Sequence, residues 1–219
     1  MQRLVFLIDV DNTLLDNDRV QHDLRMELRH RLGADECELY WAHFEALRTE
    51  LGYADYLGSL QRMRQSGVNE QQLQDISAFL LAYPFADRVY DGARAALQHL
   101  RRWGRNVILS DGDIVFQPHK IRTSRLHHDV DGRVLIYIHK EQMLDHIEQI
   151  YPAQHYVMID DKLRILSAMK QIWGDRLTTI FVRQGHYGLD HKANAAYPPA
   201  DISLEHIGEL IEYQPPLGI

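Results

Sequence analysis

Short apolar runs alternate with amphipathic helical patterns through most of this 219-residue chain, and this alternation restricts the fold more than any other feature. Each run is rich in β-branched and aromatic residues and is bounded by turn or helix signals, which is typical of buried parallel strands. Strands that alternate with helices favour a parallel sheet with right-handed crossovers. We therefore expect an α/β fold with a doubly wound, Rossmann-like sheet of about five strands, at residues 3–10, 106–110, 133–138, 155–160 and 177–182.

One long segment interrupts this alternation directly after the first strand. From about Asp16 to Pro84, apolar residues recur at three-and-four spacing, and glycines divide the segment into three or four helical stretches. No convincing strand pattern occurs there. We expect residues 17–86 to form an all-helical insertion, and residues 1–16 and 87–219 to form the core that contains the sheet.

Composition narrows the class of partner. The net charge of −7 argues against a nucleic acid or an anionic membrane, because both require a basic surface. Cys37 is the only cysteine, so no internal disulfide can form, and a reducing cytoplasm is the expected location. The N-terminal apolar run is too short for a signal peptide, and no stretch is long enough to cross a membrane. The oligomeric state stays open.

Three of the expected strands carry a polar residue at or next to their carboxyl end: Asp9, Ser110 and Asp160. In an open α/β sheet, ligands bind at the carboxyl ends of the strands, so these side chains can share one site. Asp11 follows Asp9 at a spacing of two and can point the same way from extended backbone. One carboxylate of such a pair can attack phosphorus while the other transfers protons. Asp9 and Asp160 offer the hard oxygen ligands that suit Mg²⁺, and Ser110 with adjacent N–H groups can hold a phosphoryl oxygen.

The order of these motifs resembles the haloacid dehalogenase superfamily of hydrolases, in which Mg²⁺-dependent phosphatases predominate. FLIDVDNTL matches the family's apolar strand followed by Asp-x-Asp-x-Thr, VILS matches its second motif, and VMIDD matches its fourth. The resemblance covers residues 3 to about 212, and the helical insertion resembles the family's mobile cap. It implies that Asp9 is the nucleophile and that Asp11 is the general acid and base, with its backbone carbonyl also binding Mg²⁺.

The family also places a lysine near the start of the helix before the fourth strand. Lys140 lies 20 residues before Asp160 and Lys120 lies 40 before it, and the spacing favours Lys140. Asp111 stands where relatives often carry Asn, and it can point away and leave the N–H of Gly112 for the phosphate. The predicted catalytic residues are Asp9, Asp11 and Lys140; the predicted phosphate-binding residues are Asn12, Thr13, Ser110, Asp111 and Gly112; the predicted Mg²⁺ ligands are Asp9, Asp11 and Asp160, with Asp161 as a possible neighbour of those ligands.

The sequence thus predicts a Mg²⁺-dependent phosphatase that hydrolyses a small soluble phosphomonoester through an aspartyl-phosphate. A phosphoglucomutase-like phosphotransferase is an alternative, because it keeps both aspartates. Haloacid dehalogenase relatives lack the second aspartate, and a non-catalytic regulator that binds phosphometabolites would be expected to lose one of the site residues. Thirteen scattered histidines predict no histidine metal site. The cap arginines 48, 62 and 64 could bind a second anionic group of the substrate, but solvated helix faces are the preferred interpretation. Residues 184–188 are interpreted as a Gly-rich connection in preference to a functional loop.

Overall fold

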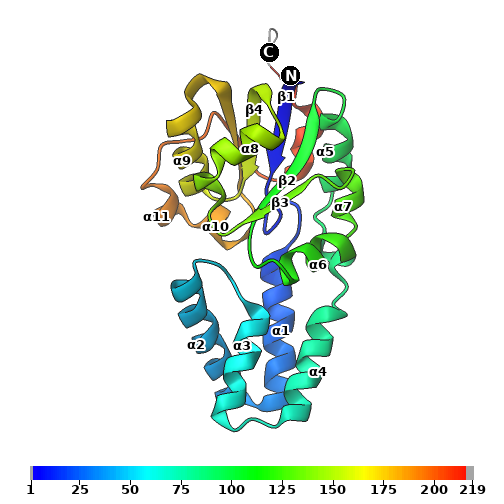
Figure 1. The fold of residues 1–219 in the computed structure, drawn as a ribbon, viewed down its shortest axis with the longest axis vertical. Helices are drawn as coiled ribbons and strands as arrows, with labels where there is room; N and C mark the ends of the chain where they lie inside the picture. Colours follow the sequence, from blue (N-terminus) through cyan, green and yellow to red (C-terminus); the bar gives the residue numbers. More distant parts are fainter. Residues whose placement is uncertain (1, 216–219) are drawn as a thin grey trace.

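A parallel sheet of six strands forms the centre of the computed structural model, which describes residues 2–215 (Figure 1). The strand order is β3-β2-β1-β4-β5-β6, which is that of a doubly wound α/β fold. The predicted α/β class is confirmed, with one strand more than expected. The strands are β1 (Gln2–Ile8), β2 (Arg105–Asp111), β3 (Val134–Tyr137), β4 (Ala153–Asp160), β5 (Leu177–Val182) and β6 (Ile202–Leu204).

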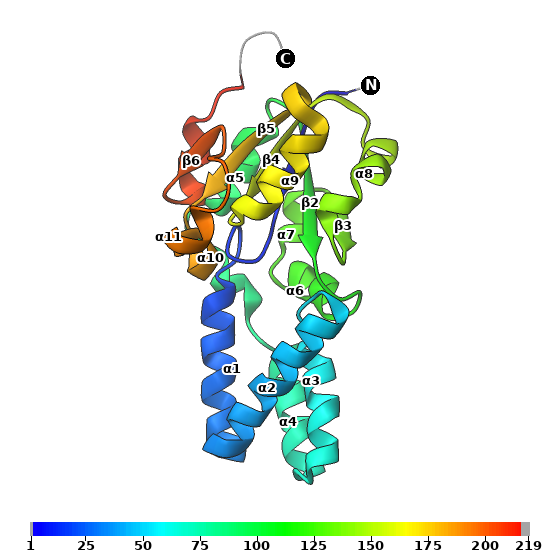
Figure 2. The same cartoon turned by 90° about the vertical axis from the view of Figure 1, so that its left-hand side faces the viewer.

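Two apolar cores enclose the sheet, one on each face. Phe6 and Ile8 of β1 pack into one core, whereas Val5 and Leu7 pack into the other, because successive strand side chains point to opposite faces. Figure 2 shows the helices that cover the two faces. They are α5 (Ala93–Leu100), α6 (Phe116–Thr123), α7 (Leu126–Asp129) and η5 (Ile207–Glu212) against the first core, and α8 (Leu144–Ile150) and α9 (Leu163–Trp173) against the second.

Four helices between β1 and α5 lie together below the sheet, at the end opposite the two termini (Figure 1). We refer to α1–α4 as the cap helices. Polar side chains begin three of them: Asp16, Asp55 and Asn69 each accept a hydrogen bond from a backbone N–H of the first helical turn. The cap helices are α1 (Asn17–Leu32), α2 (Ala34–Leu51), α3 (Tyr56–Met63) and α4 (Glu70–Leu81), with the 3₁₀ turn η1 (Arg64–Ser66) after α3.

Two predicted helices are altered in the structure. The apolar periodicity of residues 204–213 predicts a helix, but Leu204 is the last residue of β6 and Ile207–Glu212 form the 3₁₀ helix η5. Residues 140–150 also have the apolar periodicity of one helix, but the structure divides them into the 3₁₀ turn η3 (Lys140–Gln142) and α8, so Lys140 lies in a tight turn. The remaining short elements are η2 (Phe85–Arg88), η4 (Gly174–Arg176), α10 (Gly185–Leu189) and α11 (His191–Asn194).

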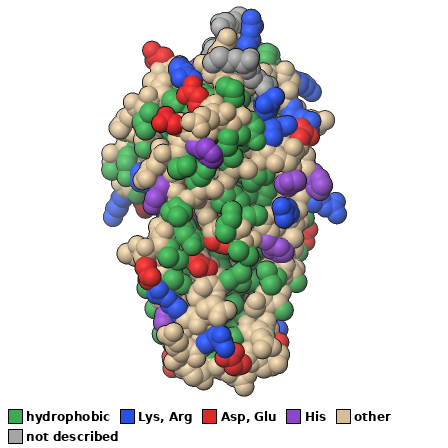
Figure 3. Space-filling model, viewed as in Figure 1, with side chains coloured by type: hydrophobic (Ala, Val, Ile, Leu, Met, Phe, Trp, Pro, Cys, Tyr) green, Lys and Arg blue, Asp and Glu red, His purple; other side chains and the backbone are tan. Residues whose placement is uncertain are grey.

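The surface carries charges of both signs in a scattered pattern. Hydrophobic side chains gather across the middle of the face drawn in Figure 3, near the level at which the cap helices meet the core. Among residues 2–215, no helix has both the length and the apolar character needed to cross a membrane.

Two glycines with left-handed backbone provide a test of the packing between α5 and η5. Gly92 has φ +78°, and an added Cβ would lie 2.7 Å from the Cα of Gly208, whereas Gly67 has φ +75° with no atom within 4 Å of that position. Gly67→Ala should therefore lower the free energy of unfolding by about 1 kcal/mol, because only the left-handed backbone conformation disfavours the alanine there. Gly92→Ala should cost about 1–3 kcal/mol more, because it also overpacks a backbone contact. Urea unfolding of both variants would measure this difference, and equal losses would contradict the close approach.

Candidate active site

The loop after β1 turns sharply at the carboxyl end of the sheet. The N–H of Asp9 still donates to the Ile159 carbonyl at 3.0 Å, so the ladder with β4 extends to this residue. Asn12 then adopts a left-handed conformation with φ 62°, and its side-chain oxygen accepts from the N–H groups of Asn17 and Asp18 at 3.0 and 3.1 Å. Asn12 thus connects the loop to the start of α1. The predicted phosphate-binding residue has its amide oxygen engaged in this turn.

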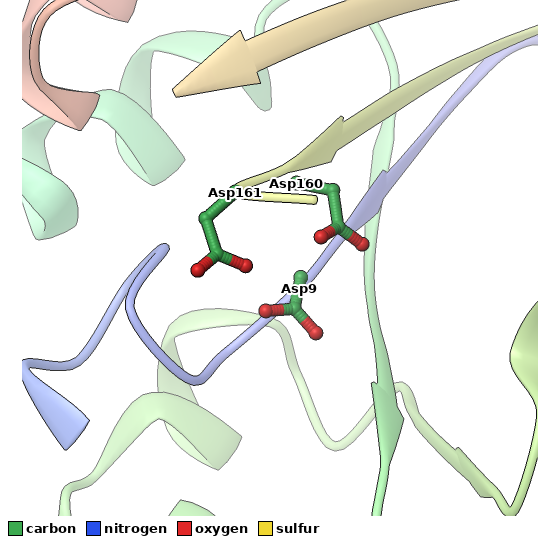
Figure 4. A group of neighbouring side chains, drawn as sticks. All are labelled: Asp9, Asp160 and Asp161. Carbon is green, nitrogen blue, oxygen red and sulfur yellow. The ribbon is translucent and has the colours of Figure 1, made fainter. Parts of the chain in front are cut away.

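Three buried carboxylates lie together where β1 and β4 end (Figure 4). Asp9, Asp160 and Asp161 each offer an oxygen within 4.8 Å of the others. One oxygen of Asp9 and both oxygens of Asp161 have no hydrogen-bond partner among the described residues. Buried carboxylates without partners are unfavourable, and hard cations bind such oxygens, so this cluster fits a divalent ion such as Mg²⁺. Asp161, predicted only as a neighbour of the ligands, is part of the cluster itself.

Burial shifts the titration of this cluster. Removal from water raises the pKa of Asp160 to about 6, and the nearby charge of Asp9 adds to the effect. Burial likewise raises the pKa of Asp161 well above its usual range. A bound cation would favour the charged forms of both groups, so metal binding and ionisation are coupled here.

Lys140 supplies a buried positive charge beside these carboxylates. Its Nζ lies 2.5 Å from Asp9 Oδ1 and 2.7 Å from Asp160 Oδ2, and its side chain is 1% exposed. Burial alone would lower the pKa of Lys140, but Asp160 and Asp9 hold it above the ordinary value. The lysine is therefore a cation at neutral pH. This is the position that its sequence spacing indicated.

Lys120, the other candidate lysine, also lies at the site but contacts a different aspartate. Its Nζ is 2.8 and 3.0 Å from the two oxygens of Asp11. The side chain comes from α6, where Phe116, Gln117, Lys120 and Ile121 are all buried. This helical spacing could have predicted from the sequence that Lys120 is buried. The sequence analysis considered only the distance of Lys120 from Asp160.

The end of β2 holds Ser110 in a polar network. Gln117 Nε2 donates to Ser110 Oγ at 2.8 Å, while Asp111 accepts from the N–H of Lys140 at 2.8 Å. Asp111 thereby links β2 to η3, and burial raises the pKa of its carboxyl. The N–H of Gly112 donates to the Tyr137 carbonyl at 3.0 Å, next to the pairing of β2 with β3. This N–H is therefore not free to bind a phosphate, in contrast to the prediction. Thr13 is buried, and its hydroxyl has no partner among residues 2–215.

A cavity of about 440 Å³ opens between the cap helices and the core, and Asp11, Asp111 and Lys162, which are neighbours in sequence of the residues at the strand ends, line it. Arg48 of α2 lines it and donates to the Tyr187 hydroxyl of α10, so this arginine joins the cap to the core. By contrast, Arg62 and Arg64 pair with Glu50 and Glu70 on exposed faces, as the sequence interpretation expected. Residues that the sequence interpretation did not select also line the cavity: Tyr53, Lys162, Arg164, Tyr187 and Tyr197.

The 184–188 segment, interpreted as a simple connection, contacts the cap. His186 donates from its backbone N–H to Asp18 Oδ2 at 2.7 Å, and its ring Nδ1 lies 2.5 Å from Asp18 Oδ1. These contacts join α10 to the first turn of α1. The cavity is therefore closed on one side by direct polar contacts between cap and core.

Comparison with known proteins identifies the family of this chain. The family model described as hydrolase, haloacid dehalogenase-like hydrolase, matches residues 4–172. A search of curated proteins found no match.

Solved structures share the fold over nearly the whole chain. A haloacid dehalogenase-like hydrolase from Burkholderia xenovorans LB400 is 58% identical, with 98% of this chain and 100% of that chain covered and a TM-score of 0.93. A haloacid dehalogenase-like family hydrolase from Xanthomonas campestris is 18% identical, with coverage of 96% and 90% and a TM-score of 0.70. L-2-haloacid dehalogenase from Xanthobacter autotrophicus is 16% identical, with coverage of 97% and 98% and a TM-score of 0.62. The last two show likeness of fold alone. The family match and the 58% identical relative show that this chain belongs to the haloacid dehalogenase-like hydrolases.

Proposed function

We propose that this hydrolase is a Mg²⁺-dependent phosphatase that acts on a small phosphomonoester through an aspartyl-phosphate on Asp9. The observation that carries the proposal is the buried carboxylate cluster, in which unpartnered oxygens of Asp9 and Asp161 lie beside Asp160. Bound Mg²⁺ would neutralise charge on the substrate phosphate and hold it against Asp9. Asp9, Asp160 and Asp161 are the side chains that would hold the ion.

The residues of the site can carry out both half-reactions. A carboxylate oxygen of Asp9 attacks phosphorus and the P–O bond to the alcohol breaks, while Asp11 gives its proton to the departing oxygen. Water then attacks the phosphorus of the aspartyl-phosphate, Asp11 takes a proton from it, and the bond from phosphorus to Asp9 breaks to release phosphate. Lys140 stabilises the charge on Asp9 throughout, from 2.5 Å. In this proposal Ser110 would hold a phosphoryl oxygen.

Asp11 favours phosphoryl transfer over dehalogenation. An alkoxide leaving group needs a proton, whereas a halide does not. Asp11 lines the cavity, so it can reach a leaving group there. Release of halide from 2-chloropropionate without phosphatase activity would instead favour the reaction named for the Xanthobacter neighbour.

The cavity favours a substrate that is compact and anionic. Its volume of about 440 Å³ suits a small metabolite. Arg48, Lys162 and Arg164 offer cationic groups to an anionic substrate, beside the carboxylates of Asp11, Glu45 and Asp111 that also line the cavity. Sugar phosphates, phosphoglycolate and nucleotides belong in the first screen of phosphorylated metabolites. Turnover that depends on added sugar bisphosphate would identify a phosphotransferase.

Replacement of the nucleophile tests the proposal directly. Asp9→Asn should lower kcat for 4-nitrophenyl phosphate by at least about 10³-fold, because no covalent intermediate can form. EDTA should abolish wild-type turnover, and Mg²⁺ should restore it. Asp175→Asn, at an exposed position in η4, is the matched control and should leave kcat unchanged. Phosphatase activity retained in pure Asp9→Asn protein would refute the assignment of the nucleophile.

Removal of an unpartnered carboxylate tests the metal site through stability rather than activity. Burial raises the pKa of Asp161 in the folded protein, so the folded state binds more protons than the unfolded state above about pH 4. The wild type should therefore lose stability relative to Asp161→Asn as the pH rises from 4 to 7. In EDTA at pH 7 the variant should be more stable than the wild type. Urea unfolding at several pH values measures this.

Added Mg²⁺ should stabilise the wild type more than Asp161→Asn and so oppose the difference in stability expected in EDTA. Binding to the folded state alone stabilises it by mass action, and the variant has lost one ligand. Mg²⁺ should thus raise the melting temperature of the wild type more than that of Asp161→Asn. An equal rise in both proteins would show that Asp161 does not bind the ion.

A further inference from the structure

Lys120 is one of the largest fully buried side chains of the protein, and the proposed reaction gives it no role so far. An ammonium group inside a protein is costly unless it is paired. Lys120 Nζ has acceptors for all three of its hydrogens: the two oxygens of Asp11 at 2.8 and 3.0 Å, and the side-chain oxygen of Asn17 at 2.9 Å. Its charge is thus paired by the aspartate that the proposed reaction uses for proton transfer.

A second side chain of α6 helps to fix Asp11. Gln117 Nε2 lies 3.3 Å from Asp11 Oδ2 and 2.8 Å from Ser110 Oγ. One turn of α6 therefore sets the position of Asp11 relative to Ser110, the residue proposed to hold the phosphoryl group. The Asp11 side chain is 26% exposed, so its orientation depends on these contacts rather than on close packing.

The same lysine also connects Asp11 to the cap. Asn17 is the first residue of α1, and its Nδ2 lies 3.4 Å from the hydroxyl of Tyr56 in α3. Lys120 Nζ lies 5.8 Å from the centre of the Tyr56 ring, and Gln21 donates to the Tyr56 hydroxyl at 3.1 Å. The chain of contacts runs from Asp11 through Lys120 to two cap helices.

We propose that Lys120 is a positioning residue that orients Asp11 for proton transfer and ties this orientation to the docking of α1 and α3. The inference rests on the proposed phosphatase function and extends it. Lys120 acts through Asp11 and takes no part in bond making. Its loss should therefore affect the step in which the leaving group needs a proton more than any other step.

Two substrates of similar size separate this role from a structural one. Benzyl phosphate releases an alkoxide that needs the proton of Asp11, whereas 4-nitrophenyl phosphate releases a stable phenoxide that needs it far less. Lys120→Met should lower kcat/KM for benzyl phosphate by about 10- to 100-fold, within the range of general acid catalysis, and for 4-nitrophenyl phosphate by less than about threefold. The ratio of the two values does not depend on the fraction of folded enzyme. Lys170→Met, at a lysine paired with Asp201 away from the cavity, should leave the ratio unchanged.

A second variant and a double mutant complete the test. Asn17→Ala removes one partner of Lys120 and should shift the ratio in the same direction by a smaller factor, and it carries the test if Lys120→Met does not fold. In an Asp11→Asn background, Lys120→Met should change the ratio by less than about twofold, because the two residues act as one unit.

The possible failures are distinguishable. If the wild type with Mg²⁺ hydrolyses neither ester, the proposed function is wrong and this inference is wrong with it. If the wild type hydrolyses both esters but Lys120→Met, or Asn17→Ala in its place, changes the two values equally, only the positioning role is overturned.

Discussion

The ion pairs of Lys140 with Asp9 and Asp160 hold together the site on which the proposed chemistry depends. They join β1 to β4, the two neighbouring strands between which the chain order of the sheet reverses. Buried carboxylates so close together would repel one another, and a buried cation between two of them offsets this cost. The cluster of three carboxylates still exceeds the charge of Lys140 and leaves oxygens unpartnered, which explains why a divalent cation fits there.

The central strands could be predicted from the sequence, but the edge of the sheet could not. β1 and β4 are largely apolar because both of their faces are buried, and such runs can be recognised as strands from the sequence alone. β6 has only three residues, of which Ile202 and Leu204 are half-buried, so its pattern carries little signal. Pairing of Leu204 with Val182 draws that residue into the sheet and shortens the helix that local periodicity predicts. The edge strand is thus a product of tertiary contact.

In the candidate site, too, the features set by the strands themselves could be predicted, whereas contacts between residues far apart in the sequence could not. The ends of the expected strands at Asp9, Ser110 and Asp160 predicted one shared edge of the sheet, because parallel strands end at one edge, and the family resemblance added Lys140, which contacts Asp9 and Asp160 in the structure. The bond from Gly112 N–H to Tyr137 was not predictable, since it depends on the register of β2 and β3. The pairing of Lys120 with Asp11 joins residues 109 positions apart through an α6 face whose orientation the sequence leaves open.

The short loop between β1 and α1 links the position of the cap helices to the position of Asp11. α1 begins at Asn17, so only a short loop that contains Asp11 and Asn12 separates the end of β1 from the cap. Asn12 bonds the first N–H groups of α1, and Asn17 shares Lys120 with Asp11. A rigid-body movement of α1 would therefore strain hydrogen bonds that hold Asp11, the proposed acid and base. In this chain the loop that leads into α1 and the side chain of Asp11 form one hydrogen-bonded unit, so a movement of the cap helices is expected to move Asp11, the proposed acid and base, as well.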